Sequence, residues 1–153
     1  MRIAIRPLAY RLSREDSFMT PEAKTAVSKK DAYNPEATLY ERLGRRPRIE
    51  EIVDAIWVNH TSNPLIKQRY VNSDPARVKL MVTEMCCAGF GGPEAYTGKD
   101  MITAHRGMNI NEVEFVAVCD DVLDALEKCN VGKRERDEVL AILYSLKPEV
   151  VHL

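Results

Sequence analysis

The 153-residue sequence has no apolar run approaching the roughly 18 residues that cross a bilayer, so we expect no membrane-spanning helix. An excess of charge is also lacking, because 22 Lys and Arg residues are balanced by 23 Asp and Glu residues. Without a basic stripe, neither nucleic acid nor an anionic membrane is an expected partner. The first residues interleave arginines with apolar residues and lack the continuous apolar stretch of a secretory signal, which favours a cytoplasmic protein.

The four cysteines lack the spacing of a zinc site. Cys86 and Cys87 are adjacent, and Cys119 and Cys129 are far apart, whereas structural zinc sites use closely spaced Cys-x-x-Cys pairs. Adjacent cysteines also rarely build a disulfide framework. We therefore expect buried, reduced thiols rather than a zinc centre.

Alternating strand patterns bounded by hairpin turns are absent, and from Thr38 onward the apolar residues recur at helical spacing. Residues 1–36 are polar with little periodicity, so we predict an N-terminal extension there, partly disordered or with a short helix at 21–30. Residues 37–153 are predicted to form one all-α domain.

Capping patterns mark the starts of the predicted helices. Thr38 is followed three positions later by Glu41, the pattern of a capping box, and Pro47 suits a helix N-terminus. Asp74 before Pro75 predicts another helix start. Further signals are Asn111 with Glu114 as a cap, Gly91-Gly92-Pro93 and Pro148 as breaks, and apolar faces within 49–60, 78–89, 115–129 and 139–146.

His105 lies in a segment, residues 94–110, that is too short and too glycine-rich for an ordinary bundle helix. Met101 and Ala104 give it apolar and small neighbours. A neutral imidazole in this setting suits a ligand held beside a flat cofactor, since histidine commonly ligates heme iron. The residues alone leave open the alternatives of a surface histidine or a hydrogen-bonded core histidine.

The order of motifs resembles the truncated hemoglobins, most closely group I. The matching stretches are TLYERLG (38–44), IVDAIW (52–57), NPLI (63–66), FGGPEAYTGKDM (90–101), AHRGM (104–108), NEVEF (111–115) and LEKCNV (126–131). The resemblance implies a truncated globin fold, a two-over-two helical sandwich in which a loop largely replaces the proximal helix. It also implies that His105 is the proximal ligand of heme b, iron protoporphyrin IX.

The resemblance further implies which residues surround the heme. Tyr96 matches a loop tyrosine near a heme propionate, and Lys79 and Lys99 are either charged partners of the propionates or solvated lysines. The expected cofactor contacts are His105, Trp57, Tyr70, Val78, Met81, Val82, Met85, Tyr96, Met101, Ile110, Phe115 and Val118.

The distal side departs from the family pattern. Where the family has a Phe-Tyr pair whose hydroxyl donates a hydrogen bond to bound oxygen, this chain has Ile56-Trp57. Val78 and Val82 occupy positions that are often polar. An apolar distal pocket is therefore predicted, in which only Trp57 and Tyr70 could donate a hydrogen bond, unless Trp57 merely fills space and Tyr70 merely packs against the heme edge.

We therefore predict a heme protein that binds a diatomic gas, namely dioxygen, nitric oxide or carbon monoxide, with use in oxygen transport, redox chemistry or sensing. One alternative is an enzyme that converts dioxygen and nitric oxide to nitrate with the help of a reductase. Another is a heme-based sensor or interaction module with a signalling partner. A heme-free helical interaction domain also remains open. His60 is expected to be a hydrogen-bonded core or edge histidine, with second ligation of iron as the alternative.

Overall fold

All regular structure in residues 34–153, the part that the computed structural model describes, is helical apart from one isolated bridge. The prediction of an all-α domain is confirmed for these residues. Within them, no helix is long and apolar enough to cross a membrane. The extension predicted over residues 1–36, with its short helix at 21–30, lies outside the described residues except for a turn at 35–36.

The helix starts follow the capping residues. Helix α1 (Leu39–Arg42) begins with the capping box of Thr38 and Glu41, and α3 (Pro75–Gly89) begins where Asp74 accepts the first free backbone N–H groups. Helix α5 (Glu112–Lys128) has the predicted capping box at its start.

The start of helix α2 (Arg45–Ser62) differs from the prediction. It begins two residues before Pro47, because Gly44 turns the chain with a left-handed φ of 96°. Pro47 therefore lies inside the first turn of α2, where its missing N–H is harmless. The local signal was correct, but the glycine rather than the proline sets the boundary.

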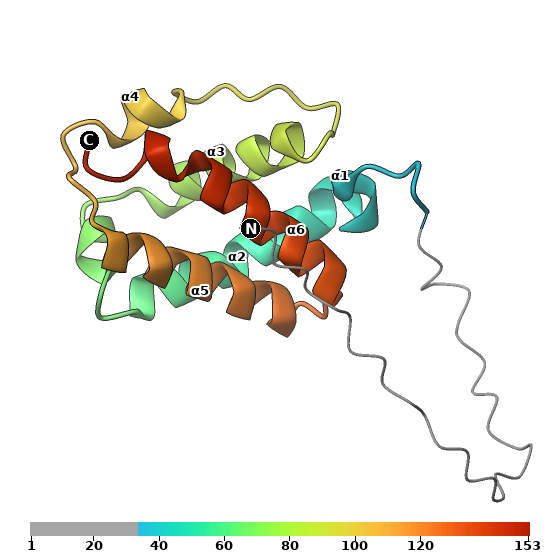
Figure 1. Cartoon of the computed structure of the whole chain (residues 1–153), viewed down its shortest axis with the longest axis horizontal. Coiled ribbons are helices and arrows are strands. Elements are labelled where there is room, and N and C mark those ends of the chain that lie inside the picture. Colours follow the sequence, from blue (N-terminus) through green and yellow to red (C-terminus); the bar gives the residue numbers. More distant parts are fainter. Residues whose placement is uncertain (1–33) are drawn as a thin grey trace, which may run out of the picture. The chain divides into compact units, whose positions relative to one another are not determined.

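The body of the domain is formed by helices α2, α3, α5 and α6 (Figure 1). Helix α2 packs against both α3 and α5, and α6 (Lys133–Leu146) packs on α5. Short elements connect these helices, namely η2 (Lys67–Tyr70), α4 (Met101–His105) and η3 (Lys147–Glu149). The short elements η2 and α4 are the ones that bring Tyr70 and His105 to the interior.

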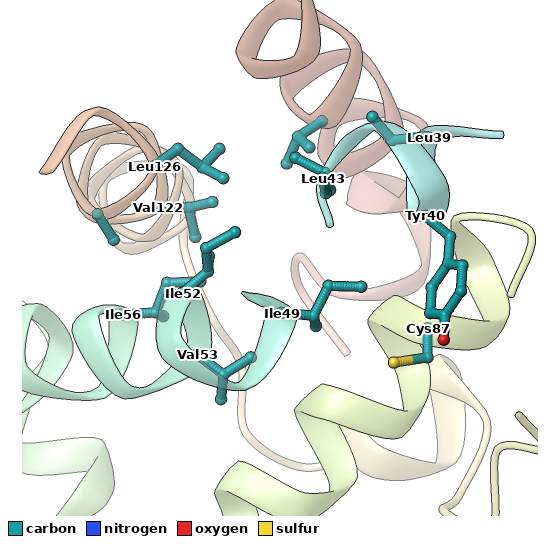
Figure 2. Close-up of a cluster of buried hydrophobic side chains, with 12 residues drawn as sticks. Leu39, Tyr40, Leu43, Ile49, Ile52, Val53, Ile56, Cys87, Val122 and Leu126 are labelled. Atoms are coloured by element: carbon teal, nitrogen blue, oxygen red, sulfur yellow. The ribbon is translucent and has the colours of Figure 1, made fainter. Parts of the chain in front are cut away.

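The main core lies where α2 meets its neighbours (Figure 2). Ile49 and Ile52 of α2 face the same cluster as Leu126 of α5, and each is nearly fully buried. On α3 the most buried side chains are Thr83 and Cys87. The face predicted from the helical spacing consists instead of Val78, Met81, Val82, Met85, Cys86 and Gly89. The residues of that predicted face are only half-buried because they line a cavity instead of packing against protein.

A second, smaller core surrounds the C-terminal residues. Phe115 and Val150 are buried there with Cys119, and Met101 and Ile110 pack against them. The backbone N–H of His152 donates to the carbonyl of Ile110 at 2.9 Å, and Val151 pairs with Ile110 in the isolated parallel bridge. This C-terminal bridge, formed by residues 109–110 and 151–153, holds the turn that follows His105.

Candidate functional site

A cavity of about 980 Å³ lies inside the domain and is walled by residues from all the long helices. Its volume falls in the range of sites for cofactors and other small molecules. All twelve residues predicted to contact a cofactor line this cavity: His105, Trp57, Tyr70, Val78, Met81, Val82, Met85, Tyr96, Met101, Ile110, Phe115 and Val118. The sequence motifs and the fold therefore converge on one interior space.

The imidazole of His105 has one nitrogen engaged by the backbone of its own helix. Its Nδ1 lies 2.8 Å from the carbonyl oxygen of Met101. A carbonyl oxygen only accepts, so Nδ1 is the donor, and in a neutral imidazole with this bond Nε2 keeps its lone pair. This is the tautomer that a histidine needs in order to ligate a metal through Nε2, with the second nitrogen held by an outer partner.

The loop before α4 is fastened to α3 by Thr97. Both its backbone N–H and its hydroxyl donate to Oε2 of Glu84, at 3.0 and 2.6 Å. These bonds lower the pKa of Glu84 below its usual value, so the carboxylate stays ionised. The neighbouring Tyr96 lines the cavity, and its hydroxyl donates to the carbonyl of Lys99 at 2.7 Å.

Gly98 is required for this position of Tyr96, and its replacement by alanine is expected to displace the ring. An added Cβ would overlap the hydroxyl and the ring carbons of Tyr96. Overpacking of this kind costs about 1–3 kcal/mol when the neighbour cannot move, and less if the ring swings out. We expect Gly98→Ala to lower the unfolding temperature and to speed the loss of any bound cofactor.

Gly89→Ala is the matched control for thermal unfolding of the chain without cofactor, because nothing lies within 4 Å of where its Cβ would be and the residue closes helix α3. Alanine at that helical position should leave stability unchanged or raise it slightly. Equal unfolding temperatures of the two variants would contradict the role assigned to Gly98.

Apolar side chains of α3 make up a large part of the cavity lining, to which α2 contributes Trp57 and η2 contributes Tyr70. The two rings meet edge to face, with centroids 5.6 Å apart and planes at 83°. Burial raises the pKa of Tyr70 to about 12, and the nearby charge of Asp121 adds to that rise, so the phenol keeps its proton.

His60 also lines the cavity, although its side chain is only 9% exposed. Its Nδ1 lies 2.9 Å from Oδ2 of Asp121, so the expectation of a hydrogen-bonded core histidine is confirmed. Burial lowers the pKa of His60, and the Asp121 carboxylate opposes that effect only in part. The ring is therefore neutral at neutral pH.

The two lysines expected near a propionate differ in position. Lys79 lines the cavity, and its Nζ pairs with Oδ1 of Asp54 at 2.9 Å. Lys99 is exposed and is not among the residues that line the cavity. Of the two, only Lys79 is placed to meet a group inside the cavity.

Arg69 is a cavity residue that the sequence did not reveal. Its guanidinium donates twice to the carboxylate of Glu114, at 2.8 and 2.9 Å, and once to the carbonyl of Met108 at 2.9 Å. The pair joins η2 to the start of α5 and raises the pKa of Arg69 while lowering that of Glu114. No local pattern links two residues that are 45 positions apart.

The four cysteines are all free thiols, and all lie within the described residues. Cys86 lines the cavity, and burial raises its pKa to about 12. A thiol with such a pKa stays protonated, and a protonated thiol is a poor metal ligand and a poor nucleophile. Within residues 34–153, no cluster of acidic, histidine and cysteine side chains could hold a bare metal ion.

Comparison with known sequences gives consistent relatives. The family model described as bacterial-like globin matches residues 38–152. The group 1 truncated hemoglobin of Tetrahymena pyriformis is 24% identical over 118 residues, which cover 77% of this chain and 98% of that protein. The group 1 truncated hemoglobin LI410 of Chlamydomonas moewusii is 26% identical over 139 residues, which cover 86% of this chain and 81% of that protein.

Solved structures agree with the sequence relatives. The truncated hemoglobin of Tetrahymena pyriformis in its Fe(III) form superposes with a TM-score of 0.74 at 23% identity, covering 76% of this chain and all of that one. The 2/2 hemoglobin of Synechococcus sp. PCC 7002, in the cyanomet state with covalently attached heme, gives 0.68 at 26% identity, covering 72% and 94%. The predicted two-over-two helical sandwich is thereby confirmed.

Proposed function

Because this chain belongs to the bacterial-like globin family and is a group 1 truncated hemoglobin, we propose that it binds heme b through His105 and takes up a diatomic gas on the opposite side of the cavity. The observation that carries this proposal is the placement of His105. Its ring lines an interior cavity of about 980 Å³ while Nδ1 is committed to the Met101 carbonyl. Nε2 is therefore the nitrogen whose lone pair could bind the iron.

The residues of the cavity fit a porphyrin. Helix α3 offers a largely apolar surface for one face of a flat macrocycle. Phe115 and Val118 of α5 line the same cavity as His105 and add further apolar surface. Lys79 and Tyr96 supply the polar groups at which carboxylate side chains of a porphyrin could end. The chain has no Cys-x-x-Cys-His sequence for thioether attachment, which favours heme b over a c-type heme.

Each side of the cavity has its own task. Heme, when bound, supplies an iron centre that takes up a small gas reversibly. His105 holds the iron from one side, and Met101 fixes its ring through the carbonyl hydrogen bond. The apolar residues of α3 would keep water away from a bound gas, and Trp57 and Tyr70 are two cavity residues that could donate a hydrogen bond to it.

A spectrum of the purified full-length chain tests the proposal directly. With hemin added and the iron reduced under carbon monoxide, we expect a stoichiometric, saturable change to the absorption of a histidine-ligated ferrous heme. One heme per chain and saturation at equimolar hemin are the expected results. Weak, non-saturating absorption like that of a control protein without a hemin site would overturn the proposal.

The proposal also covers the extent of the domain, its cofactor and its ligand. The globin domain runs over residues 37–153, heme is the only cofactor proposed, and a diatomic gas is the proposed ligand. A cytoplasmic reductase or signalling partner would be needed only if the gas is turned over or sensed.

A further inference from the structure

The ring of Tyr70 is held between two aromatic neighbours in the cavity wall. Its phenol is stacked on the His60 imidazole, with centroids 5.5 Å apart and planes within 20°. The indole of Trp57 meets it edge-on from the other direction, at 5.6 Å. Both neighbours come from α2, so one helix fixes the ring of the short η2 element.

The imidazole of His60 is itself fixed by α5. Asp121 accepts from Nδ1 of His60 at 2.9 Å through Oδ2 and from the side-chain amide of Asn63 at 3.0 Å through Oδ1. The backbone carbonyl of Asp121 also accepts from the amide of Asn59 at 2.8 Å. His60 cannot turn without losing its bond to the Asp121 carboxylate, whose other oxygen is held by Asn63.

The side chains of His60 and Asp121 are only 9% and 15% exposed, so burying the pair costs folding free energy. Burying a carboxylate and an imidazole requires their desolvation, and an apolar side chain of similar volume at position 60 would avoid that cost. Carboxylates that hold a histidine ring at functional sites serve to fix its orientation. Here the ring that is oriented carries Tyr70 on its face.

The hydroxyl of Tyr70 is available to a molecule in the cavity. It has no hydrogen-bond partner among residues 34–153, and the side chain lines the cavity. Since the phenol keeps its proton at neutral pH, the group is a donor.

We propose that His60, oriented by Asp121, is a positioning residue that holds the Tyr70 hydroxyl toward a gas molecule in the cavity and so sets how long the gas stays. The inference rests on the proposed function, because it concerns the same cavity. It adds a hydrogen-bonded unit, reaching from α5 through α2 to η2, that the family resemblance did not imply.

A double-mutant cycle on the holoprotein tests the inference. The dissociation rate of dioxygen and the stretching frequency of bound carbon monoxide are measured for His60→Ala, Tyr70→Phe and the double variant. We expect His60→Ala to speed dissociation by about 2- to 150-fold, the range of coupling between contacting residues. The same substitution should have almost no effect on the rate or the frequency when Tyr70 is already phenylalanine.

Two further variants separate orientation from folding. His60→Phe keeps a ring to stack on Tyr70 but loses the bond to Asp121, so its dissociation rate should lie between those of the wild type and His60→Ala. Asp121→Asn keeps an acceptor oxygen for Nδ1 and should act mildly, whereas Asp121→Ala should resemble His60→Ala. If His60→Ala fails to fold, Asp121→Ala with and without Tyr70→Phe gives the same decision, with Asp121→Asn as its control.

Several results would overturn the inference. Equal effects of His60→Ala with and without Tyr70 would show that the imidazole acts independently of the phenol. No effect in either background would show that it does nothing to the gas. A six-coordinate ferrous spectrum that His60→Ala abolishes would show that His60 binds the iron itself.

A readout without heme keeps the two proposals distinguishable. Trp57 is the single tryptophan, so its fluorescence in the full-length chain before hemin is added reports the packing against Tyr70. His60→Ala should shift this emission to the red, and His60→Phe should leave it near the wild-type value. Emission that stays the same in His60→Ala overturns the positioning role, whereas failure of the wild-type chain to take up hemin overturns the proposed function.

Discussion

Replacing His105 by alanine should abolish specific heme binding, with a loss of affinity on the order of 100-fold or more. The estimate is a lower bound, because even the outer partners of metal ligands are worth about 10- to 100-fold in affinity. His105 is the only histidine whose Nδ1 donates to a backbone carbonyl within residues 34–153 while its ring lines the cavity. Hemin titration followed by absorption, with transfer to a heme acceptor protein, measures the change.

The control for this variant is rescue by a small ligand. Alanine at position 105 leaves room for free imidazole, which should restore the ferrous spectrum when added at millimolar concentration. His152→Ala is the matched substitution, since His152 is exposed and lies outside the cavity. An unaltered affinity in His105→Ala, or an equal loss in His152→Ala, would refute His105 as the ligand.

Glutamine at position 82 should slow the dissociation of dioxygen by about 5- to 150-fold. Val82 lines the cavity from α3, and a side-chain amide there adds a donor that the valine lacks. Bound dioxygen carries partial negative charge, and a buried hydrogen bond to it contributes about 1–3 kcal/mol. Each 1.4 kcal/mol is a factor of ten in the rate if the whole effect falls on dissociation. Stopped-flow displacement of dioxygen by carbon monoxide gives the rate.

Val82→Met controls for the added volume, because it lengthens the side chain without adding a donor. If Val82→Met slows dissociation as much as Val82→Gln, the effect is steric and the distal wall is not short of donors. Trp57→Phe belongs in the same measurement, since an unchanged rate would assign Trp57 to filling the pocket. A long-lived dioxygen complex in the wild-type chain would favour the alternative that turns dioxygen and nitric oxide into nitrate.

The parts of the fold that depend on neighbouring residues were predictable. The capping boxes at Thr38 and Asn111 and the cap at Asp74 are local hydrogen bonds, so a few letters of sequence specify them. The boundary of α2 was placed too late because it depends on the left-handed backbone of Gly44, a conformation that the sequence permits but does not announce.

The lining of the cavity was predictable for a different reason. The motifs around His105 and Tyr96 identified the family pattern. That pattern predicted twelve cofactor contacts, and all twelve residues line the same cavity. Long-range polar pairs were not predictable in this way. His60 and Asp121 are 61 positions apart, and Arg69 and Glu114 are 45 apart, so only the packing of helices brings them together.

The sequence also failed to predict which side of α3 packs against protein and which side lines the cavity. Helical spacing identified one apolar face, but Thr83 and Cys87 are the residues that bury most deeply. A cavity on one side of a helix makes its apolar residues half-exposed, and periodicity alone does not distinguish a cavity from a neighbouring helix.

The pairing of residues 109–110 with 151–153 makes the last residues part of the wall that carries the candidate iron ligand. The N–H of Asn109 donates to the carbonyl of Leu153 at 2.8 Å, and Asn109 and His152 both have left-handed backbones that make the pairing possible. A displacement of His105 that moves residues 109–110 would break this pairing at about 0.5–1.5 kcal/mol for each hydrogen bond. The rigidity of the backbone that follows His105 thus depends partly on residues 151–153, which lie more than 40 positions further along the chain.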